Sequence, residues 1–461
     1  MIWKAIMIDD GIINSKKIQE YIISQRWFQN KNDKIIEFRI NDAISYKNII
    51  FFVLDALTSN GKYMYYFPVI LDETSNIIDT VDGHTVCDAA FSENYAASLA
   101  RFFESGIEIK GMAGSIKFVP TEFYRPIGRG GFSPIRSEQS NSSLIIGDMI
   151  IKNYRYLQFG DNPDIKMALA LKQNGFPNVP LPEAYCLYST VKGSIYIISA
   201  SEFIKGSSDL WTVMAKKISE ICSKDVQYQK KVDEIMDYSG SISKKLGNLT
   251  GEMHRALYSA KEEDFYPEMA NLNDFQAILD ETASNLSESG MVKNDLIERT
   301  KNIFEYKILR LNLSNATKFR IHGDYHLGQI LASDRLYVID FEGEPMRSLS
   351  QRSAKQFPLR DVAGMVRSLS YLLHYSGTYL EKNDLESIYE NSKGIFLSCY
   401  KEAIKDFGIV PESIFSIMDL FLLQKASYEL LYEIKNRPSW ANIPLNEIIA
   451  IYDRIKDPEN K

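Results

Sequence analysis

Short apolar runs separated by polar turns dominate the first third of the chain. Residues 35–44, 48–57 and 62–72 are rich in β-branched and aromatic side chains, which is typical of strands. A helix is predicted over residues 91–105, and a further strand follows at 114–120. The pattern therefore predicts a β-rich N-terminal region.

A second β-rich unit follows residues 124–143, which are rich in Gly, Pro and Ser and predict a loop. Residues 144–154 predict a hairpin with a Gly-Asp turn, and 161–175 predict a helix that ends at a Gly. Two more strands are expected, at 183–189 and 194–203.

Apolar residues then recur at helical spacing of three and four positions. Helices are predicted over residues 213–240, 245–264 and 421–437, and the segment 321–345 interrupts them as a hairpin. The expected fold class is α+β, with a β-containing N-terminal half and a mostly helical C-terminal half.

Composition changes this picture little. The 461 residues allow two to three domains, and 45% hydrophobic and 25% charged residues are ordinary for a globular protein. The net charge of −7 is the opposite of the positive charge that is typical of nucleic-acid-binding proteins. Asp9 and Asp10 interrupt the apolar N-terminus, and no run reaches the roughly 20 apolar residues that cross a membrane. Four separate cysteines without a CxxC pair indicate free thiols, so a cytoplasmic protein is expected.

The hairpin segment IHGDYHLGQILASDRLYVIDFEGEP carries the clearest candidate chemistry. Asp324 lies in a loop, Gln329 enters a strand, and Asp340 leaves the next strand. Phosphoryl transfer needs a carboxylate that orients the attacking hydroxyl and oxygen ligands that hold Mg²⁺. His322 and His326 are expected to tie down the loop. A single Asp in a turn is usually only turn chemistry, but the ordered set favours a catalytic site.

A nucleotide site is expected in the second β-rich unit, although no GxxxxGKS motif occurs. Ser140, Asn141 and Ser142, expected between strands, can offer N–H and hydroxyl groups to phosphates. Lys152 on the next strand is placed to reach the α- and β-phosphates, as the strand lysine of kinases does. The alternative phosphate loop is the GRGG segment at 128–131, and the alternative for Lys152 is a solvent-facing strand lysine.

The motifs HGDYHLGQIL and VIDFEGEP resemble the aminoglycoside-phosphotransferase and eukaryotic-like kinase superfamily, in its maltokinase branch. Residues 347–371, 436–445 and 25–31 are similar to that family as well. The resemblance implies a two-lobed protein-kinase-like fold with a cap subdomain (1–110), a nucleotide lobe (111–204) and a helical lobe (205–461).

The resemblance also implies roles for individual residues. Asp324 would be the catalytic base, Gln329 and Asp340 would ligate Mg²⁺, and ATP would be the phosphate donor. The backbone of Glu202, Phe203 and Ile204 would contact adenine, as in the hinge between kinase lobes.

The sequence departs from the family pattern at two places. Lys166 stands where a helix glutamate is expected to pair with Lys152, which leaves Asp164 as the nearest alternative partner. Phe357 replaces a serine that often precedes the Pro of the SPLRD motif.

The acceptor site is expected on the segment KASYELLYEIKNRPSW, which resembles the maltose-binding region of maltokinases. It combines aromatic faces with charged groups, a pairing common in sugar sites. The candidate residues are Lys425, Tyr428, Glu429, Tyr432, Arg437 and Trp440. Periodicity alone would favour a core helix with a charged face. Arg360 and Asp361 open a predicted helix and are expected to support the site without contacting the substrate. His254 and His374 are expected to stabilise the fold and not to take part in the chemistry.

The resemblance implies phosphorylation of maltose at its anomeric hydroxyl, giving maltose 1-phosphate and ADP in a trehalose or glycogen pathway. A trehalose synthase partner is a further possibility. Two alternatives stay open: another small-molecule kinase such as a glucosamine kinase, and a non-catalytic nucleotide-binding scaffold. A hydrolase is disfavoured, because no GxSxG elbow or paired metal-binding histidines occur.

Overall fold

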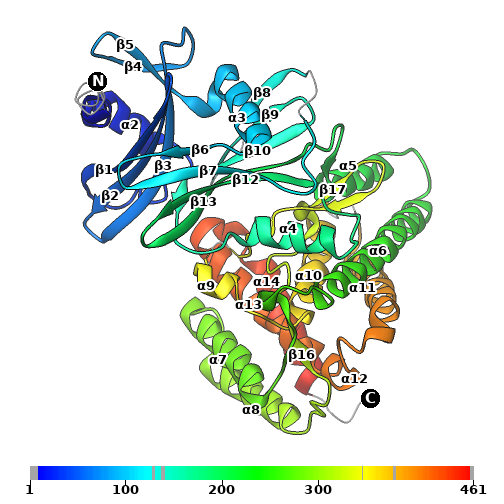
Figure 1. The fold of residues 1–461 in the computed structure, drawn as a ribbon. Coiled ribbons are helices and arrows are strands. Elements are labelled where there is room, and N and C mark those ends of the chain that lie inside the picture. The colour runs from blue at the N-terminus through cyan, green and yellow to red at the C-terminus, as the bar shows by residue number, and fades with distance from the viewer. Residues whose placement is uncertain (1–8, 127–129, 136–140, 345, 377–379, 457–461) are drawn as a thin grey trace. The chain divides into compact units, whose positions relative to one another are not determined.

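The computed structural model describes residues 9–126, 130–135, 141–344, 346–376 and 380–456. The chain forms two compact units, Met1–Leu169 with Pro180–Lys205, and Ala170–Val179 with Gly206–Lys461. Antiparallel sheets make up the first unit and helices most of the second, which confirms the predicted α+β class (Figure 1). The finer three-part division at residues 110 and 204 stays a prediction.

The first unit begins with an antiparallel sheet in the order β1-β2-β3-β5-β4. The strands are β1 (Ile35–Tyr46), β2 (Ile49–Thr58), β3 (Gly61–Leu71), β4 (Ile77–Val81) and β5 (His84–Asp88). Helix α2 (Lys16–Ser24), capped by Ser15, buries Ile18 and Ile22 in the core that the first sheet shares with it. Strand β2 is buried along almost its whole length, with Phe51 in one apolar cluster and Phe52 in the other, so its continuous apolar run reflects a strand buried on both faces.

A second sheet follows in the order β6-β7-β12-β13-β10-β9-β8. Its strands are β6 (Glu108–Lys110), β7 (Gly114–Pro120), β8 (Phe132–Ile135), β9 (Asn141–Ile146), β10 (Met149–Tyr154), β12 (Pro182–Thr190) and β13 (Gly193–Glu202). Helix α3 (Glu93–Ser105) packs Phe102 and Phe103 against Phe118 of β7. The predicted hairpin over 144–154 is confirmed, with Gly147 in the left-handed region that its turn needs.

The loop predicted over residues 124–143 is partly wrong. Strand β8 lies inside it, and β9 begins there, because Phe132 pairs with Ile146 and Ile135 with Ser143 across an antiparallel ladder. The Gly, Pro and Ser content hid these strands, since such residues usually mark loops.

The chain that leaves β10 of the second sheet pairs with the first sheet. Strand β11 (Tyr156–Leu157) pairs with β3, and the N–H of Tyr66 donates to the carbonyl of Arg155 at 2.8 Å. One buried apolar cluster includes residues of β2, β7 and β13. Helix α4 (Pro163–Gln173) starts and ends as predicted, with the Asn162 side chain accepting from the Asp164 N–H and Gly175 at positive φ.

The second unit is built from long helices and several short ones. The long helices are α5 (Leu210–Cys222), α6 (Tyr228–Tyr258), α7 (Leu272–Ser289), α8 (Asn294–Ile308), α10 (Leu359–Ser376), α11 (Lys382–Ile404), α13 (Met418–Asn436) and α14 (Asn442–Lys456). The predicted helix over 213–240 is wrong in its bounds. It breaks at residues 223–227, where the N–H groups of Ser223 and Lys224 turn back onto α5.

Two small sheets lie between the helices along the chain. The predicted hairpin is confirmed as β17 (Ile330–Ala332) and β18 (Leu336–Val338), and β14 (Ser208–Asp209) adds a third strand that the sequence did not predict. A second pair joins β15 (Glu268–Met269) to β16 (Thr317–Lys318). Within the described residues, no helix has the length and apolar character needed to cross a membrane.

Candidate active site

The loop that carries Asp324 is held by the carboxylate of Asp361, at the start of α10. The N–H groups of His322 and Gly323 donate to its two oxygens at 2.8 and 2.9 Å. On its other side His254 of α6 lies 3.1 Å away and also contacts Tyr400. Burial would raise the pKa of Asp361, but the hydrogen bond and charge of His254 outweigh it and lower the pKa. Asp361 therefore stays ionised and fixes the loop backbone, as its predicted bracing role requires.

His322 adds a second restraint to the same loop. Its Nε2 donates to the Ile339 carbonyl at 3.1 Å, because a carbonyl can only accept. Its Nδ1 therefore accepts the N–H of Asp324, at 3.3 Å. One imidazole thus ties the Asp324 backbone to the segment that leads from β18 to Asp340.

Gln329 and Asp340 meet as predicted. The Gln329 Nε2 atom donates to the Asp340 Oδ2 atom at 2.9 Å. Gln329 ends the short 3-10 helix η3 (Leu327–Gln329) just before β17, and Asp340 follows β18 with a φ of 65°. A positive φ is costly for a residue other than glycine and is often found at functional sites.

The two side chains offer hard oxygen donors of the kind that Mg²⁺ prefers. Glu342 is a third oxygen source that the sequence analysis overlooked, since one of its carboxylate oxygens lies within 4.8 Å of an Asp340 oxygen. The donor set fits a divalent cation held by a few protein oxygens and completed by water or phosphate.

Lys425 of α13 lies beside Asp324. Its Nζ atom is 3.3 Å from Asp324 Oδ1 and 2.7 Å from Glu344 Oε1. Burial would lower the pKa of Lys425, but Glu344 and then Asp324 outweigh this and raise it. The ammonium group is therefore charged, and its Nζ hydrogens bridge the two carboxylates.

Glu344 is the residue that the sequence analysis missed at this position. It is almost fully buried, and besides Lys425 it contacts Arg347 and Arg360, the latter at 3.8 Å. Burial acts to raise the pKa of Glu344, but Lys425, Arg347 and Arg360 together lower it to about 2. Arg347 also reaches Glu281 of α7 at 2.5 Å. Arg360 thus contacts Glu344 and not Asp324 itself, and its predicted supporting role stays a prediction.

His326 faces Asp324 from the other side. Its Nδ1 accepts the N–H of Gly328 at 3.0 Å, so a neutral ring carries its proton on Nε2. That nitrogen lies 3.9 Å from Asp324 Oδ2. The ring thus caps η3, which fits the predicted role of tying down the loop.

Glu429 belongs to a buried ion-pair group. Arg367 of α10 donates to it at 2.9 Å and to Glu447 of α14 at 3.0 Å. Burial raises the pKa of Glu429, and Arg367 opposes that rise. Tyr428 is buried next to Lys425, whose Nζ lies 5.2 Å from its ring centroid. Both predicted residues therefore lie near Lys425, but Glu429 already has a cationic partner.

The remaining predicted acceptor residues lie at the end of α13. Arg437 forms a two-point ion pair with Glu433 and lies over the rings of Tyr432 and Trp440. Trp440, in the 3-10 helix η6 (Pro438–Trp440), also stacks on Tyr375 at a centroid distance of 5.9 Å. These side chains form an aromatic and cationic cluster of their own, and no contact links them directly to Asp324 among the described residues.

In the first unit Lys152 of β10 faces helix α4. Its Nζ atom is 3.6 Å from Asp164 Oδ2, and Tyr154 donates to the same carboxylate at 3.2 Å. Lys166, where the resemblance expects a glutamate, pairs instead with Asp161. Asp164 thus takes the place of the expected partner for Lys152.

Two of the three predicted phosphate residues lie in a strand, not in a loop. Asn141 and Ser142 lie in β9, opposite Tyr154 and Asn153, and both are buried. The Ser142 hydroxyl accepts from the buried Arg155 guanidinium at 2.9 Å. The loop expectation is therefore wrong for these two, because strand pairing uses their backbone; Ser140 and residues 128–129 of the GRGG segment lie outside the described residues.

The predicted adenine contacts lie at the end of β13. The N–H of Glu202 donates to Leu181, and the N–H of Phe203 donates to Asp148, at 2.9 and 2.8 Å. The Glu202 side chain accepts from the Leu181 N–H, at 3.3 Å. Two of the backbone donors expected to hold adenine are thus used within the sheet, and Ile204 follows them.

Comparisons with known proteins identify the fold. No protein-family model matches the sequence. The glucosamine kinase of Mycolicibacterium smegmatis is 24% identical over 331 residues, which are 70% of this chain and 80% of that protein. The glucosamine kinase of Streptacidiphilus jiangxiensis is 24% identical over 393 residues, 79% of this chain and 82% of that protein.

Solved structures agree. Glucosamine kinase in its crystal form A has a TM-score of 0.68 at 18% identity and covers 98% of this chain and 99% of its own. The complex of glucosamine kinase with glucosamine, ADP and inorganic phosphate has a TM-score of 0.67 at 17% identity, over 96% and 98% of the two chains. The chain has the fold of a glucosamine kinase. The match spans nearly the whole chain, so the β-rich N-terminal region belongs to this fold.

Several residues escaped the sequence analysis, among them Glu344 next to Lys425, its partner Arg347, and Arg367 next to Glu429. Glu344 lies in the motif VIDFEGEP itself, and a third acid after Asp340 and Glu342 was the sequence signal that could have found it. Arg367 gave no such signal, because its partners Glu429 and Glu447 lie 62 and 80 residues away.

Proposed function

We propose that the protein is an ATP- and Mg²⁺-dependent sugar kinase. The observation that carries the proposal is the convergence of Gln329 and Asp340 next to a loop that holds Asp324. The fold shared with glucosamine kinases supports it, since one of those structures holds ADP and inorganic phosphate together with a sugar.

In this mechanism Asp324 orients the attacking sugar hydroxyl and accepts its proton. Asp361 and His322 hold the Asp324 backbone, and Lys425 supplies a positive charge beside the carboxylate. Because Asp361 and His322 are buried and Lys425 is held between two carboxylates, little reorganisation is needed when charge moves in the transition state.

Asp340 and Gln329 would hold Mg²⁺, which neutralises phosphate charge when it is bound. Lys152, positioned by Asp164, would contact the phosphates of ATP. We further propose that residues 1–110 form a cap, 111–204 the nucleotide part and 205–461 the acceptor part. The backbone near Glu202–Ile204 stays the proposed adenine contact, although the N–H groups of Glu202 and Phe203 already donate to Leu181 and Asp148.

For the acceptor we propose a neutral sugar, with maltose as the first candidate and its anomeric hydroxyl as the nucleophile. Lys425 is a hydrogen-bond donor for sugar hydroxyls beside the base. The carboxylates on this side are each held by a cation: Glu344 by Lys425, Glu429 by Arg367 and Glu433 by Arg437. This pairing favours an acceptor without an ammonium group, because an amine would need a carboxylate to itself.

The proposed product is maltose 1-phosphate in a cytoplasmic trehalose or glycogen pathway, with a trehalose synthase as a candidate partner. The second candidate acceptor is glucosamine, which is favoured by the names of the most similar proteins. Purified protein with ATP and Mg²⁺, tested on maltose, glucose and glucosamine, separates the two. Product NMR then identifies the phosphorylated oxygen. Turnover of glucosamine without maltose would reject the neutral-sugar proposal and leave the kinase proposal standing.

The kinase proposal itself is tested with Asp324→Asn. Turnover should fall by roughly 10³-fold or more, because the amide cannot accept the proton, while ADP binding and the unfolding midpoint are retained. Asp334→Asn is the matched control, since Asp334 lies at the exposed turn of the same hairpin. Wild-type protein that binds ADP and turns over no sugar would favour the scaffold alternative.

A further inference from the structure

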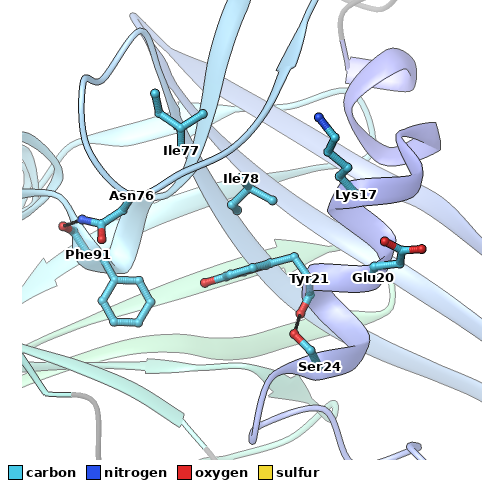
Figure 2. Close-up of a pocket in the computed structure, with 8 residues that line it drawn as sticks. All are labelled: Lys17, Glu20, Tyr21, Ser24, Asn76, Ile77, Ile78 and Phe91. Carbon is cyan, nitrogen blue, oxygen red and sulfur yellow. Dashed lines mark hydrogen bonds between the residues drawn. The ribbon is translucent and has the colours of Figure 1, made fainter.

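A cavity of about 570 Å³ lies in the first unit, and none of its lining residues belongs to the candidate active site. It is bounded by α2, by the start of β4 and by the 3-10 helix η1 (Ala89–Phe91). Figure 2 shows Tyr21 reaching from α2 with its hydroxyl toward the side of Phe91, with Ile78 drawn above it in this view. The volume is within the range of small-molecule sites in proteins.

The walls of the cavity combine aromatic faces with aliphatic groups. Tyr21 and Phe91 are both partly exposed, and Ile77 is 48% exposed. Partly exposed aromatic rings with hydrogen-bonding groups beside them suit the apolar C–H faces and the hydroxyl rim of a sugar ring.

The polar groups at the edge are balanced in charge. Lys17 pairs with Asp79 at 3.0 Å, and Glu20 lies 3.6 Å from Lys16. Ser24 and Asn76 add a neutral hydroxyl and amide. Such an edge offers hydrogen bonds without a net charge, which favours a neutral polyhydroxyl ligand over an anion or a cation.

Both walls of the cavity meet at the buried carboxylate of Asp88. The Tyr21 hydroxyl donates to Asp88 Oδ2 at 3.3 Å. The N–H of Ala90 donates to Asp88 Oδ1 at 3.0 Å, which fixes the turn that carries Phe91. A ligand that moves either ring therefore acts on this carboxylate.

Asp88 is in turn the partner of Arg155, which directly follows the strand that carries Lys152. The guanidinium of Arg155 donates to both Asp88 oxygens, at 2.7 and 2.9 Å, and to the Ser142 hydroxyl of β9. Both members of the ion pair are essentially inaccessible to solvent. The contact chain thus runs without a gap from the cavity wall to strands β9 and β10.

We propose that this cavity is a second, non-catalytic saccharide site, linked through Tyr21, Asp88 and Arg155 to the strands of the proposed nucleotide site. The site itself does not depend on the proposed function, but the choice of probe sugars does. By linkage, a sugar bound there changes ADP affinity, and ADP changes the sugar affinity by the same factor.

Binding is measured without ATP, by calorimetric titration with glucose, maltose and maltotriose. Wild-type protein should bind one of them at two sites. Tyr21→Ala, which removes one face, and Ile77→Glu, which places a carboxylate on the exposed wall, should each weaken one site at least tenfold. Tyr306→Ala, an exposed tyrosine of the second unit, is the matched control and should retain both sites. Sugar binding that Tyr21→Ala and Ile77→Glu leave unchanged would overturn the proposal.

The link is tested with Tyr21→Phe, which keeps the ring and removes only the hydroxyl that reaches Asp88. This variant should bind the sugar within about threefold of wild type. In wild type, sugar bound in the cavity should change the affinity for ADP, and Ile77→Glu should remove this effect because it removes the sugar. Tyr21→Phe should also remove the effect on ADP affinity, although the sugar still binds. A full change in Tyr21→Phe would contradict the link. The cavity site would be supported, and the kinase proposal rejected, if Tyr21→Ala and Ile77→Glu lose one sugar-binding site while wild-type protein turns over no sugar. The failure of one proposal can therefore be told from the failure of the other.

Discussion

Single residues around Asp324 set the charge balance of the proposed site. Lys425 lies between Asp324 and Glu344. Arg347 and Arg360 both approach the other carboxylate oxygen of Glu344. Buried carboxylates in such a group are stable only as long as each has its cation. The position of the positive charge next to Asp324, the proposed base, therefore depends on Glu344 as much as on Lys425.

Glu344→Gln should destabilise the protein in a pH-dependent way. The pKa of Glu344 is lowered to about 2 from its usual 4.5, so its contribution is present above pH 4.5 and is lost as the pH falls toward 2. At neutral pH the loss should be on the order of 3 kcal/mol. The measurement is urea unfolding from pH 7 down to pH 3.

The matched control for that experiment is Glu412→Gln, at an exposed pair with Lys401. It should change the free energy of unfolding by less than about 1 kcal/mol. The expectation for Glu344 fails if its variant and wild type differ by the same amount at pH 7 and pH 3.

At the scale of elements, helix α10 holds the loop that carries Asp324 in place. A Cβ atom added at Gly364 would lie 2.6 Å from the carbonyl oxygen of Tyr325, the neighbour of Asp324. The helix can approach the loop this closely only because position 364 has no side chain. Ser368, one turn further along, accepts the N–H of Leu327.

Gly364→Ala should therefore displace the loop backbone. We expect kcat to fall at least tenfold and the free energy of unfolding to fall by roughly 1–3 kcal/mol, with little change in ADP affinity. Gly394→Ala on α11 is the control, because nothing lies within 4 Å of its added Cβ and alanine favours helix. Equal activity of the two variants would show that the close approach is unimportant.

The elements also show where sequence patterns succeed. The hairpin at β9 and β10 and the hairpin at β17 and β18 were predicted because turn residues and short apolar runs act locally. Strand β8 was missed because it is stabilised by pairing with β9, while the Gly- and Pro-rich sequence around it predicts a loop. The break between α5 and α6 was missed because helical spacing alone does not reveal a polar turn.

At the scale of the whole molecule, the two proposed substrates rely on different units. Lys152 and Asp164 belong to the first unit, and Asp324 and Lys425 belong to the second. Substitutions in the first unit should therefore change mainly the KM for ATP, and substitutions in the second unit mainly the KM for the sugar.

Lys152→Met should raise the KM for ATP at least tenfold, because a phosphate contact is lost, and change the KM for the sugar less than about threefold. Lys192→Met, at an exposed position of the same unit, should leave both KM values unchanged. Steady-state kinetics with each substrate varied in turn measures this division. A Lys152 variant that affects the sugar KM alone would contradict it.

The sequence by itself determined the α+β class, most strands and helices, and the order of Asp324, Gln329 and Asp340 along one hairpin. Periodicity, capping and turn chemistry act over a few residues, and they can be seen in the sequence. Only the tertiary structure decided which cations meet the buried acids: Lys425 lies 101 residues after Asp324, and Arg367 joins Glu429 to Glu447. Such pairs depend on how distant helices pack, and no local pattern encodes that packing.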